Sequence, residues 1–336
     1  MRDHSTDIAK ALGIVLVVIG HSPLVLDAKG EPFRIVFSFH MPLFYFMAGF
    51  FLRAEQPLRV ALRTRADTLL KPYFGALALM GGGLALATGA PLVAVMRAAL
   101  TGTGEALGAA GGFPLVPRWF LPNLFATLLT GLLVVKAVQG MSRPAALLAI
   151  VSACGVVGGY WLLAHGTPRL PWSLDLLPLT LGFLLSGRLW ARHSRVRRIG
   201  VVPVALAFAL FCALHWGWDE TIDLNARRFG DPVESLLQAF AGIYLVLSFA
   251  TLLARVALVR DGLEFIGRST LFILVFHAAC MYVAKRVLGH AFAPAFIALM
   301  VPAAGLAGPL LLMAVVRRVP LLAATLLPAP RAVAAG

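Results

Sequence analysis

The chain has 336 residues, of which 60% are hydrophobic and only 13% charged, and its mean hydropathy is +0.87. A soluble domain of this length needs far more charged surface, so the composition excludes a soluble globular protein and favours one embedded in a lipid bilayer. The net charge of +14 would suit nucleic-acid binding, but the basic residues cluster in short gaps between apolar runs, as in membrane-protein loops. We therefore expect the bilayer as a partner and no nucleic acid.

Ten apolar stretches are long enough to cross a hydrocarbon core about 30 Å thick, which takes roughly 20 helical residues. We predict an all-α fold, a polytopic transmembrane helical bundle of about ten spans in a single domain, 1–336. The first stretch does not resemble a cleaved signal peptide, because Asp3 and Asp7 precede it and no small-residue cleavage site follows directly. In chain order the stretches are Ile8–Val25, Phe33–Leu52, Tyr73–Val95, Trp119–Val138, Ala145–Leu163, Leu174–Trp190, Val201–Trp218, Val233–Ala254, Phe265–Leu288 and Ala291–Val316.

The longest gap between these stretches, Arg97–Arg118, is rich in Gly and Ala and is predicted to be a loop or a re-entrant segment. The three cysteines, Cys154, Cys212 and Cys280, all lie inside apolar runs. Their odd number and wide spacing fit neither a disulfide framework nor a metal-binding motif. We expect them to be small buried residues, and we expect no metal site.

Lys and Arg are divided unevenly between the two sets of alternate loops. Twenty of the 29 fall in the set that includes both termini, and nine fall in the other. Because cytoplasmic loops carry an excess of Lys and Arg, we predict that both termini are cytoplasmic, which agrees with an even number of spans.

Three histidines lie at a similar depth on three different predicted spans. With ~1.5 Å of rise per residue, His21 lies ~20 Å from the cytoplasmic start of the first span and His277 lies ~18 Å up the ninth. His40 enters from the opposite side and lies ~10 Å down a span that crosses about 30 Å. Since ionisable groups inside a bilayer are costly, we predict a polar chamber in the outer half of the membrane. The alternative is that each imidazole only bonds a neighbouring carbonyl.

Lys10 precedes His21 by eleven residues, almost three helical turns, so the two share a face and stand ~16 Å apart along the axis. This separation suits a ligand such as coenzyme A, with its phosphates at Lys10 and its thioester near His21. Asp7 is expected to pair with Lys10 one turn away. The alternative for Lys10 is an interfacial cation that snorkels to water. The basic segment Arg53–Lys71 either helps to attract the phosphates or reflects topology alone.

These residues resemble the acyltransferase family 3 of integral membrane O-acyltransferases, and most closely its fucose 4-O-acetylase group. The opening span DIAKALGIVLVVIGHS and the block FSFHMPLFYFMAGFFLR carry the resemblance most specifically, and RWFLPNLF adds to it. Weaker matches continue in the family's order over nearly the whole chain. They are Leu170–Gly187, Ile222–Pro232 and the GRSTLFILVFH block that ends at His277.

The resemblance implies transfer of an acyl group, usually acetyl, from acyl-CoA to a hydroxyl of a sugar or surface-glycan precursor. It implies that His21 is the essential histidine, that acetyl-CoA is a co-substrate rather than a bound cofactor, and that the protein modifies polysaccharide in a bacterial cytoplasmic (inner) membrane. Many members carry Arg where this chain has Lys10. Because Lys cannot form the bidentate phosphate contact of Arg, we expect the donor contacts to differ.

Transfer to an alcohol requires a base for the hydroxyl proton and a donor for the tetrahedral oxyanion. His21 is the candidate base, because neutral imidazole accepts a proton near neutral pH. His40 or Asn123 is the candidate donor or orients the sugar, while His277 fills either role or braces the others. No serine or cysteine has an evident base beside it, so a covalent acyl-enzyme is not expected.

Acceptor contacts are predicted at residues near the outer face. Asp175 and Asp223 are candidates for sugar hydroxyls, although Asp223 fits a loop cap equally well. Trp119 and Trp172 are candidate sugar platforms, and their alternative role is to anchor the protein at the membrane interface.

A proton-coupled secondary transporter is the alternative from another class, since intramembrane histidines also relay protons. Transporters often contain two matching halves with broken helices, and no such repeat is visible. The membrane-bound O-acyltransferases with a His and Asn pair share the reaction, but their histidine normally lies late in the chain.

Overall fold

The computed structural model describes residues 4–22, 25–26, 29–89, 91–193, 200–218 and 221–329. Within them, six helical stretches are long and apolar enough to cross a membrane, which confirms an all-α, multi-pass bundle. The number of ten spans and the side of the termini stay predictions. The six are Phe113–Gln139, Pro144–Ala164, Pro171–Arg192, Pro232–Leu253, Thr270–Leu288 and Pro294–Val316. Five of the basic residues on which the predicted orientation depends lie outside the described residues, namely Arg2, Arg195, Arg197, Arg198 and Arg331.

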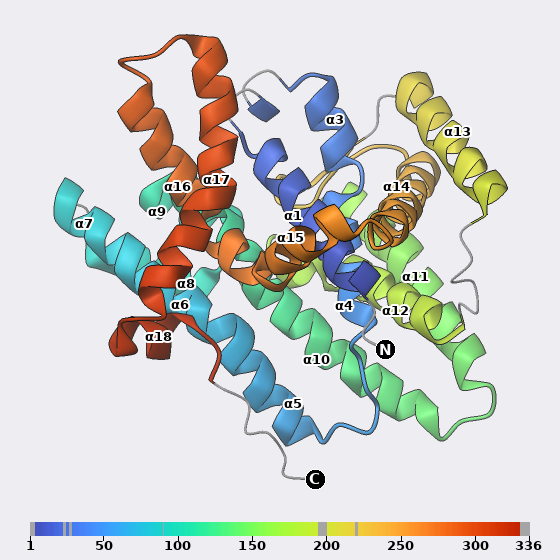
Figure 1. Ribbon diagram of the computed structural model, residues 1–336. Coiled ribbons are helices and arrows are strands. Elements are labelled where there is room, and N and C mark those ends of the chain that lie inside the picture. Colours follow the sequence, from blue (N-terminus) through green and yellow to red (C-terminus); the bar gives the residue numbers. More distant parts are fainter. Residues whose placement is uncertain are drawn as a thin grey trace.

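The elements follow one another with short connections (Figure 1). In chain order they are α1 (His4–Gly20), α3 (Glu31–Phe37), α4 (His40–Gly49), α5 (Leu58–Arg65), the π-helical η1 (Ala66–Leu70), α6 (Lys71–Ala76), the π-helical η2 (Leu77–Gly81), α7 (Gly82–Thr88), α8 (Leu92–Thr101), α9 (Gly104–Gly111), the 3₁₀ helix η3 (Phe113–Trp119), α10 (Phe120–Gln139), α11 (Pro144–Ala164), the 3₁₀ helix η4 (Pro171–Leu176), α12 (Leu177–His193), α13 (Val201–Trp218), β1 (Ile222–Asp223), β2 (Arg228–Phe229), α14 (Pro232–Leu253), α15 (Ala257–Arg268), α16 (Thr270–Leu288), α17 (Pro294–Val316) and α18 (Pro320–Leu326).

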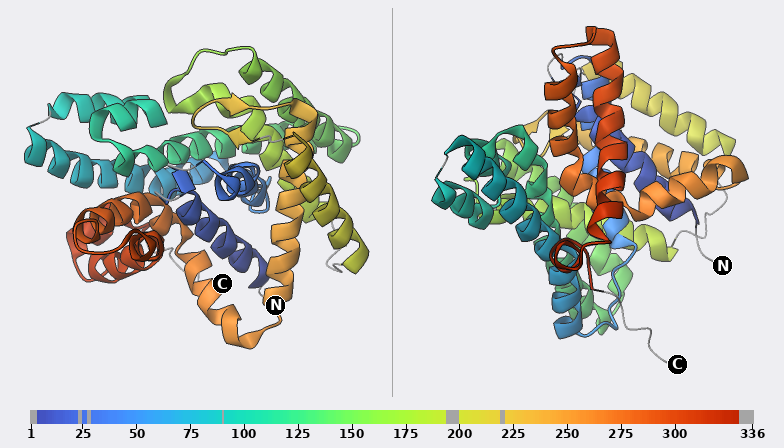
Figure 2. Two further views of the ribbon diagram at one scale, coloured as in Figure 1. Left: turned by 90° about the horizontal axis from the view of Figure 1, so that it is seen from above. Right: turned by 60° about the vertical axis from the view of Figure 1, so that its left-hand side comes forward.

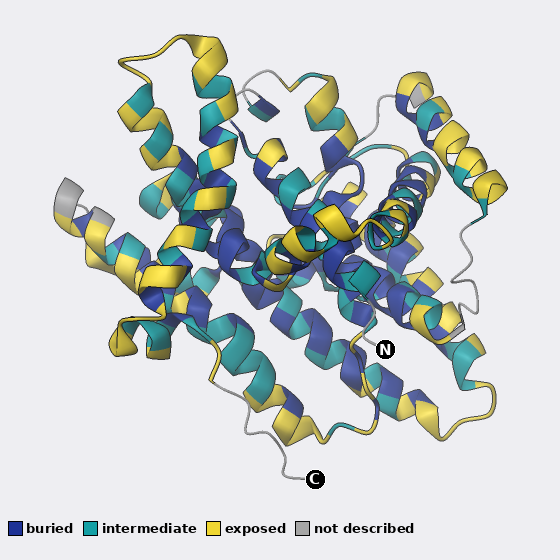
Figure 3. Ribbon diagram, viewed as in Figure 1, coloured by how far each residue is buried: buried dark blue, intermediate teal, exposed yellow. Residues whose placement is uncertain are grey.

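Helix α1 lies near the centre of the bundle, in contact with α4, α14, α15 and α16 (Figures 1 and 2). Ile8, Ile14 and Val18 on this helix are completely buried. The buried residues gather around α1 and α4, whereas exposed ones cover α13 and the outer faces of the bundle (Figure 3). Much of that outer surface is apolar, with Leu86 and Leu258 89% and 92% exposed. Apolar side chains on the outside suit a protein surrounded by lipid tails, which solvate them at no cost.

The predicted second span is two helices, α3 and α4, separated by Ser38 and Phe39. Pro42 accounts for the break, because its ring clashes with the carbonyl four residues earlier and is tolerated only in the first turn of a helix. The break leaves His40 as the first residue of α4. The sequence therefore places His40 at a helix start inside the bundle, not in the middle of a continuous span.

The region of the predicted third span also differs from expectation. Helical structure runs from Leu58 to Thr88 through η1 and η2 and stops at Gly89, whose φ of 71° is left-handed. A new helix, α8, then begins at Leu92, so the predicted span end at Val95 is wrong. The gap Arg97–Arg118 is not a loop, because α8, α9 and η3 fill most of it.

The predicted ninth span is also interrupted. Helix α15 ends at Arg268, Ser269 has φ −93° and ψ 1°, and α16 begins at Thr270. The predicted start at Phe265 therefore belongs to a separate helix that crosses α1. At the crossing the backbone of Gly267 approaches that of Asp7 so closely that a Cβ would collide with the Asp7 carbonyl.

Helices α4 and α12 cross with similarly close backbones. A Cβ added at Gly187 would collide with the carbonyl of Phe46, and one at Gly49 would collide with that of Leu184. Small residues at such crossings let membrane helices gain van der Waals contact along their backbones. The crossing fixes the position of α4, which carries His40.

Candidate functional site

The structure brings the three predicted histidines together from three helical segments. His21 follows the end of α1, His40 begins α4 and His277 lies in α16. The ring centre of His21 is 5.3 Å from that of His277 and 6.4 Å from that of His40. His40 and His277 are 1% and 0% exposed, so this is a buried cluster. Its chemical roles stay predictions.

Each of the three rings is held by the backbone of its own segment. The Nδ1 atoms of His21 and His40 lie 2.8 Å from the carbonyl oxygens four residues earlier, and Nδ1 of His277 lies 2.9 Å from Leu274 O. A carbonyl oxygen only accepts, so each Nδ1 carries the hydrogen. In the neutral ring the other nitrogen, Nε2, is then an acceptor. The chamber thus contains three basic nitrogens and no Nε2 donor from neutral histidine.

A small cavity of about 30 Å³ opens beside the cluster. Its polar lining comes from His21, His40, Trp119, Asp223 and Asn225. The predicted acceptor residues Trp119 and Asp223 therefore lie with two of the histidines. This volume holds a few atoms and no more, so only a reacting group fits between these side chains.

A second cavity, of about 910 Å³, lies towards the start of α1. Five charged residues line it: Lys10, Arg53, Glu55, Arg65 and Arg268. With four cations against one carboxylate, the cavity is an electropositive site that favours anions. Of the basic segment 53–71, only Arg53 and Arg65 reach it.

Lys10 and Asp7 form the pair that their spacing predicted. Lys10 Nζ is 3.1 Å from Asp7 Oδ1 and stands 4.6 Å from the centre of the Phe51 ring. The other carboxylate oxygen of Asp7 is 3.6 Å from Arg268 Nε. Asp7 therefore sits between two cations of the large cavity and orients both.

The two cavities share part of their walls. Phe120, the first residue of α10, and Leu274 of α16 line both of them. A ligand that fills the large cavity thus comes against the same two side chains that bound the histidine cavity. The two cavities thus adjoin at Phe120 and Leu274, between the cationic end of α1 and its histidine end.

The loop around the β1–β2 hairpin delivers Asp223 and Asn225 to the small cavity. Arg227 anchors it with a bidentate contact to Asp175, in which Nε lies 2.8 Å from Oδ2 and Nη2 lies 3.1 Å from Oδ1. Asp175 also accepts from the backbone N–H of Leu170 at 3.0 Å. Its side chain is completely buried and does not line the small cavity. Asp175 thus braces the loop, whereas a sugar contact was expected.

The polar atoms of Asn123 are likewise engaged in hydrogen bonds that stabilise the fold. Its Oδ1 accepts from Tyr45 Oη at 2.6 Å, and its Nδ2 donates to the carbonyls of Ser173 at 2.7 Å and Trp172 at 3.3 Å. Trp172 and Ser173 have φ of 58° and 53°, a left-handed conformation that side chains disfavour, and the Asn123 amide holds it. Trp172 Nε1 donates to Leu100 O at 3.0 Å and is thus also engaged away from the small cavity.

Three further residues were not singled out from the sequence. Arg268 lines the large cavity, Asn225 lines the small one, and Arg118 is fully buried, donating to Pro114 O and Met80 Sδ. Arg118 and Asn225 lie in blocks that carry the family resemblance, which was the available signal. Arg268 also lies in such a block, GRSTLFILVFH, and the end of α15 places it beside α1.

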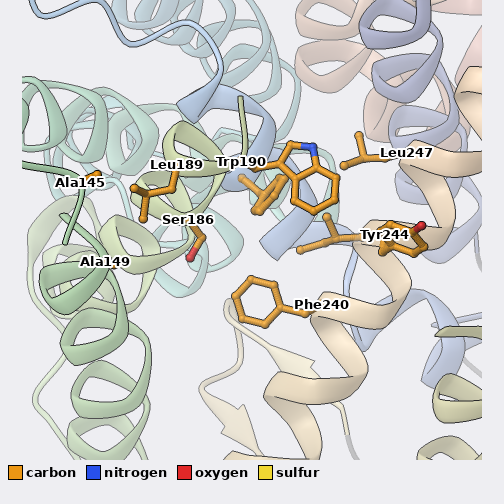
Figure 4. A pocket seen from close by; sticks show the side chains of 10 residues that line it. Ala145, Ala149, Ser186, Leu189, Trp190, Phe240, Tyr244 and Leu247 are labelled. Atoms are coloured by element: carbon orange, nitrogen blue, oxygen red, sulfur yellow. The ribbon is translucent and has the colours of Figure 1, made fainter. Parts of the chain in front are cut away.

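Another large groove contains few polar or reactive side chains. It measures about 870 Å³ between α11, α12 and α14, and mainly apolar and aromatic side chains line it (Figure 4). Ser186, its one hydroxyl besides Tyr244, is paired with Ser152 at 2.8 Å. Among the described residues no group of three or more His, Cys, Asp or Glu is arranged to hold a metal ion.

Comparison with known proteins assigns the chain to a family. Neither the curated proteins nor the solved structures contain a match. The sequence model of one family, described as an acyltransferase domain, matches residues 3–315 and so includes every residue of both cavities. A match of this extent agrees with the multi-pass bundle. The chain therefore belongs to the acyltransferase family 3 and is an integral, multi-pass membrane acyltransferase.

Proposed function

We propose that this acyltransferase moves an acetyl group from acetyl-CoA to a hydroxyl of a sugar or glycan precursor, with His21 as the general base. The observation that carries the proposal is the pair of adjoining cavities. One is large and cationic, the other small and lined by histidine, and Phe120 and Leu274 border both.

The large cavity suits the donor in size and charge. Its volume of about 910 Å³ lies in the range of sites for cofactor-sized molecules. Coenzyme A is polyanionic, so its phosphates favour the end that carries Lys10, Arg53, Arg65 and Arg268. The helical distance of ~16 Å from Lys10 to His21 lets an extended ligand reach the histidines with its thioester. If the basic loops are cytoplasmic, the donor enters from the cytoplasm.

The chemistry follows from the state of the histidines. His21 presents an unprotonated Nε2 and stands in contact with both other imidazoles. The acceptor oxygen attacks the thioester carbon while its proton passes to His21 Nε2. Collapse of the tetrahedral intermediate breaks the C–S bond, and the CoA thiolate takes the proton from His21. His40, an acceptor at Nε2 in the same cavity, orients the incoming hydroxyl, and His277 packs against the His21 ring.

The small cavity is lined to receive a hydroxyl group of the acceptor. Asp223 presents a carboxylate to accept from hydroxyl groups, and Trp119 presents an aromatic surface beside it. Since the cavity is small, the sugar inserts one hydroxyl and leaves its ring outside. The family resemblance favours fucose-like acceptors and a bacterial cytoplasmic membrane, where such enzymes modify surface polysaccharides. The transporter reading is not favoured, because the family is one of acyltransferases.

The test uses purified protein and measures thiol release from acetyl-CoA, with methyl α-L-fucopyranoside as the probe acceptor. His21→Ala should lower the turnover by about 10²–10⁴-fold, the usual contribution of a general base. Lys10→Ala should chiefly raise the apparent KM for acetyl-CoA. His165→Ala is the matched control, because His165 makes the same Nδ1 contact to a carbonyl four residues earlier but is exposed.

Near-full transfer by His21→Ala would refute the proposed base. Uptake of a solute that depends on a proton gradient, without thiol release, would refute the proposed reaction. Comparative glycan mass spectrometry of cells with and without the protein then identifies the acceptor, because a missing acetyl group marks the modified sugar.

A further inference from the structure

The proposed reaction leaves one requirement unmet by the histidines. The tetrahedral intermediate carries a negative oxygen that needs a preorganised hydrogen-bond donor. His21, His40 and His277 spend their single N–H on backbone carbonyls, so their neutral rings offer only lone pairs. The amide of Asn123, the other candidate, is occupied by Tyr45, Trp172 and Ser173.

The small cavity is also lined by a side-chain amide, that of Asn225. Its side chain lines that cavity with His21, His40 and Asp223 and makes no hydrogen bond to any described residue. Its Oδ1 is wholly buried and unpartnered, whereas Nδ2 is not closed off in this way. The amide N–H₂ is therefore the end of the side chain that is available to a group in the cavity.

The position of Asn225 is fixed from two sides. Arg227, held by Asp175, donates to the backbone carbonyls of Leu224 at 2.7 Å and Asn225 at 3.1 Å. On the far side the amide rests against Gly104, and a Cβ at Gly104 would collide with Oδ1. The loop backbone and the contact with Gly104 thus limit where the amide lies before the reaction starts, and such preorganisation makes a donor effective in a transition state.

Asp223 cannot serve in the same role. Its Oδ1 accepts from the backbone N–H of Ala226 at 2.9 Å, and a carboxylate repels a developing oxyanion. The two side chains of this loop therefore have different roles. Asp223 accepts hydrogen bonds from the hydroxyls of the acceptor, whereas Asn225 donates one to the oxyanion.

We propose that Asn225 is a catalytic residue whose Nδ2–H donates to the thioester oxygen as it becomes the oxyanion. This role rests on the proposed acetyl transfer. As the acceptor oxygen bonds to the carbonyl carbon, the C=O electron pair moves to oxygen and is met by Asn225, while the proton goes to His21. When the carbonyl re-forms, the C–S bond breaks and the thiolate leaves with that proton. Both side chains line the same cavity of about 30 Å³.

The experiment compares Asn225→Leu, which keeps the shape and removes the donor, with the unmodified protein. We measure thiol release from acetyl-CoA with methyl α-L-fucopyranoside and, separately, with water as acceptor. Because the hydrogen bond to the carbonyl oxygen is present in the bound donor and strengthens as the oxyanion forms, kcat should fall by about 10²–10³-fold in both reactions, with much smaller changes in KM. Gly104→Ala should lower kcat as well, because its Cβ meets only the movable end of the Asn225 side chain and displaces the amide while the fold remains.

A spectroscopic measurement separates a catalytic role from a structural one. Acetyl-CoA labelled with ¹³C at the thioester carbonyl is bound to His21→Ala, which does not turn over. The carbonyl infrared band should lie at lower frequency in this background than in His21→Ala with Asn225→Leu, because the hydrogen bond weakens the C=O bond.

The outcomes are distinguishable. Full kcat in Asn225→Leu, or a raised acceptor KM with unchanged kcat, overturns the role of Asn225 and leaves acetyl transfer standing. An unchanged carbonyl band overturns it too. If the unmodified protein releases no thiol from acetyl-CoA at all, the proposed function fails, and the role of Asn225 fails with it.

Discussion

The Arg227–Asp175 pair offers the sharpest test of how the site is held. The Asp175 side chain is 0% exposed and that of Arg227 10%, with two contacts of 2.8 and 3.1 Å between them. Arg227→Gln removes the guanidinium and leaves a buried carboxylate with only the Leu170 N–H. Breaking a buried pair from one side costs about 3–5 kcal/mol, because the remaining charge has lost its compensation.

The cost is measured as the half-inactivation temperature of the protein in detergent. With an unfolding entropy of about 2.1 cal/mol/K per residue, 3–5 kcal/mol in a chain of 336 residues corresponds to a fall of roughly 4–7 °C. Arg227→Gln combined with Asp175→Asn should recover much of this loss, because the double change leaves no unpaired buried charge.

The control is Arg169, which supports the same loop through an exposed pair with Glu105 and a contact of 3.5 Å to Ala226 O. Exposed ion pairs contribute about 0–1 kcal/mol, so Arg169→Gln should change the half-inactivation temperature by no more than about 2 °C. Equal effects of the two arginine substitutions would refute the reasoning, since burial would then not decide the cost. Activity should fall in Arg227→Gln even below its inactivation temperature, because the loop that carries Asn225 is released.

Three other results are expected. Arg268→Gln should raise the apparent KM for acetyl-CoA about 10-fold or more at unchanged kcat, because one charged hydrogen bond contributes about 1.5–3 kcal/mol; initial rates at varied donor check this. Gly187→Val should destabilise the crossing of α4 and α12 by about 1–3 kcal/mol through overpacking, seen as a lower half-inactivation temperature. The hydrogen bond from Lys71 lowers the pKa of Asp67, so its contacts contribute stability above the ordinary pKa and lose it as the pH falls through the lowered value. Exchange of the Ala329 amide, which donates to Asp67 at 2.7 Å, should accordingly stay slow at neutral pH and quicken in Asp67→Asn.

Hydropathy was sufficient to predict the class of fold. A helix that crosses lipid must be long and apolar. It can therefore be recognised from consecutive residues, without knowing what it packs against. The same local signal failed at Ser38–Phe39 and at Ser269, where apolar composition continues while the backbone breaks. In the gap 97–118 the composition left a loop and a re-entrant segment open, because Gly and Ala suit both, and the helices there exclude only the loop.

Depth along each helix predicted that His21, His40 and His277 lie at one level, because rise per residue is a local property. Whether they face one another depends on the rotation and crossing of three helices, which only the packing decides. The ring distances of 5.3 and 6.4 Å are therefore tertiary information.

The contrast between what the sequence predicts and what only the tertiary structure decides is clearest for polar residues of similar type. Residue type identified Asn123, Asp175 and Asp223 equally as possible ligands and did not single out Asn225, since a side chain has the same donors and acceptors wherever it stands. In the folded chain, the polar atoms of Asn123 and Asp175 are engaged in structural hydrogen bonds. Asp223 and Asn225 instead line the small cavity. The sequence by itself thus determined a membrane bundle with three histidines at a similar depth and with Lys10 almost three helical turns before His21. Only the tertiary structure decided which polar groups are free to react, because that depends on partners from distant parts of the chain.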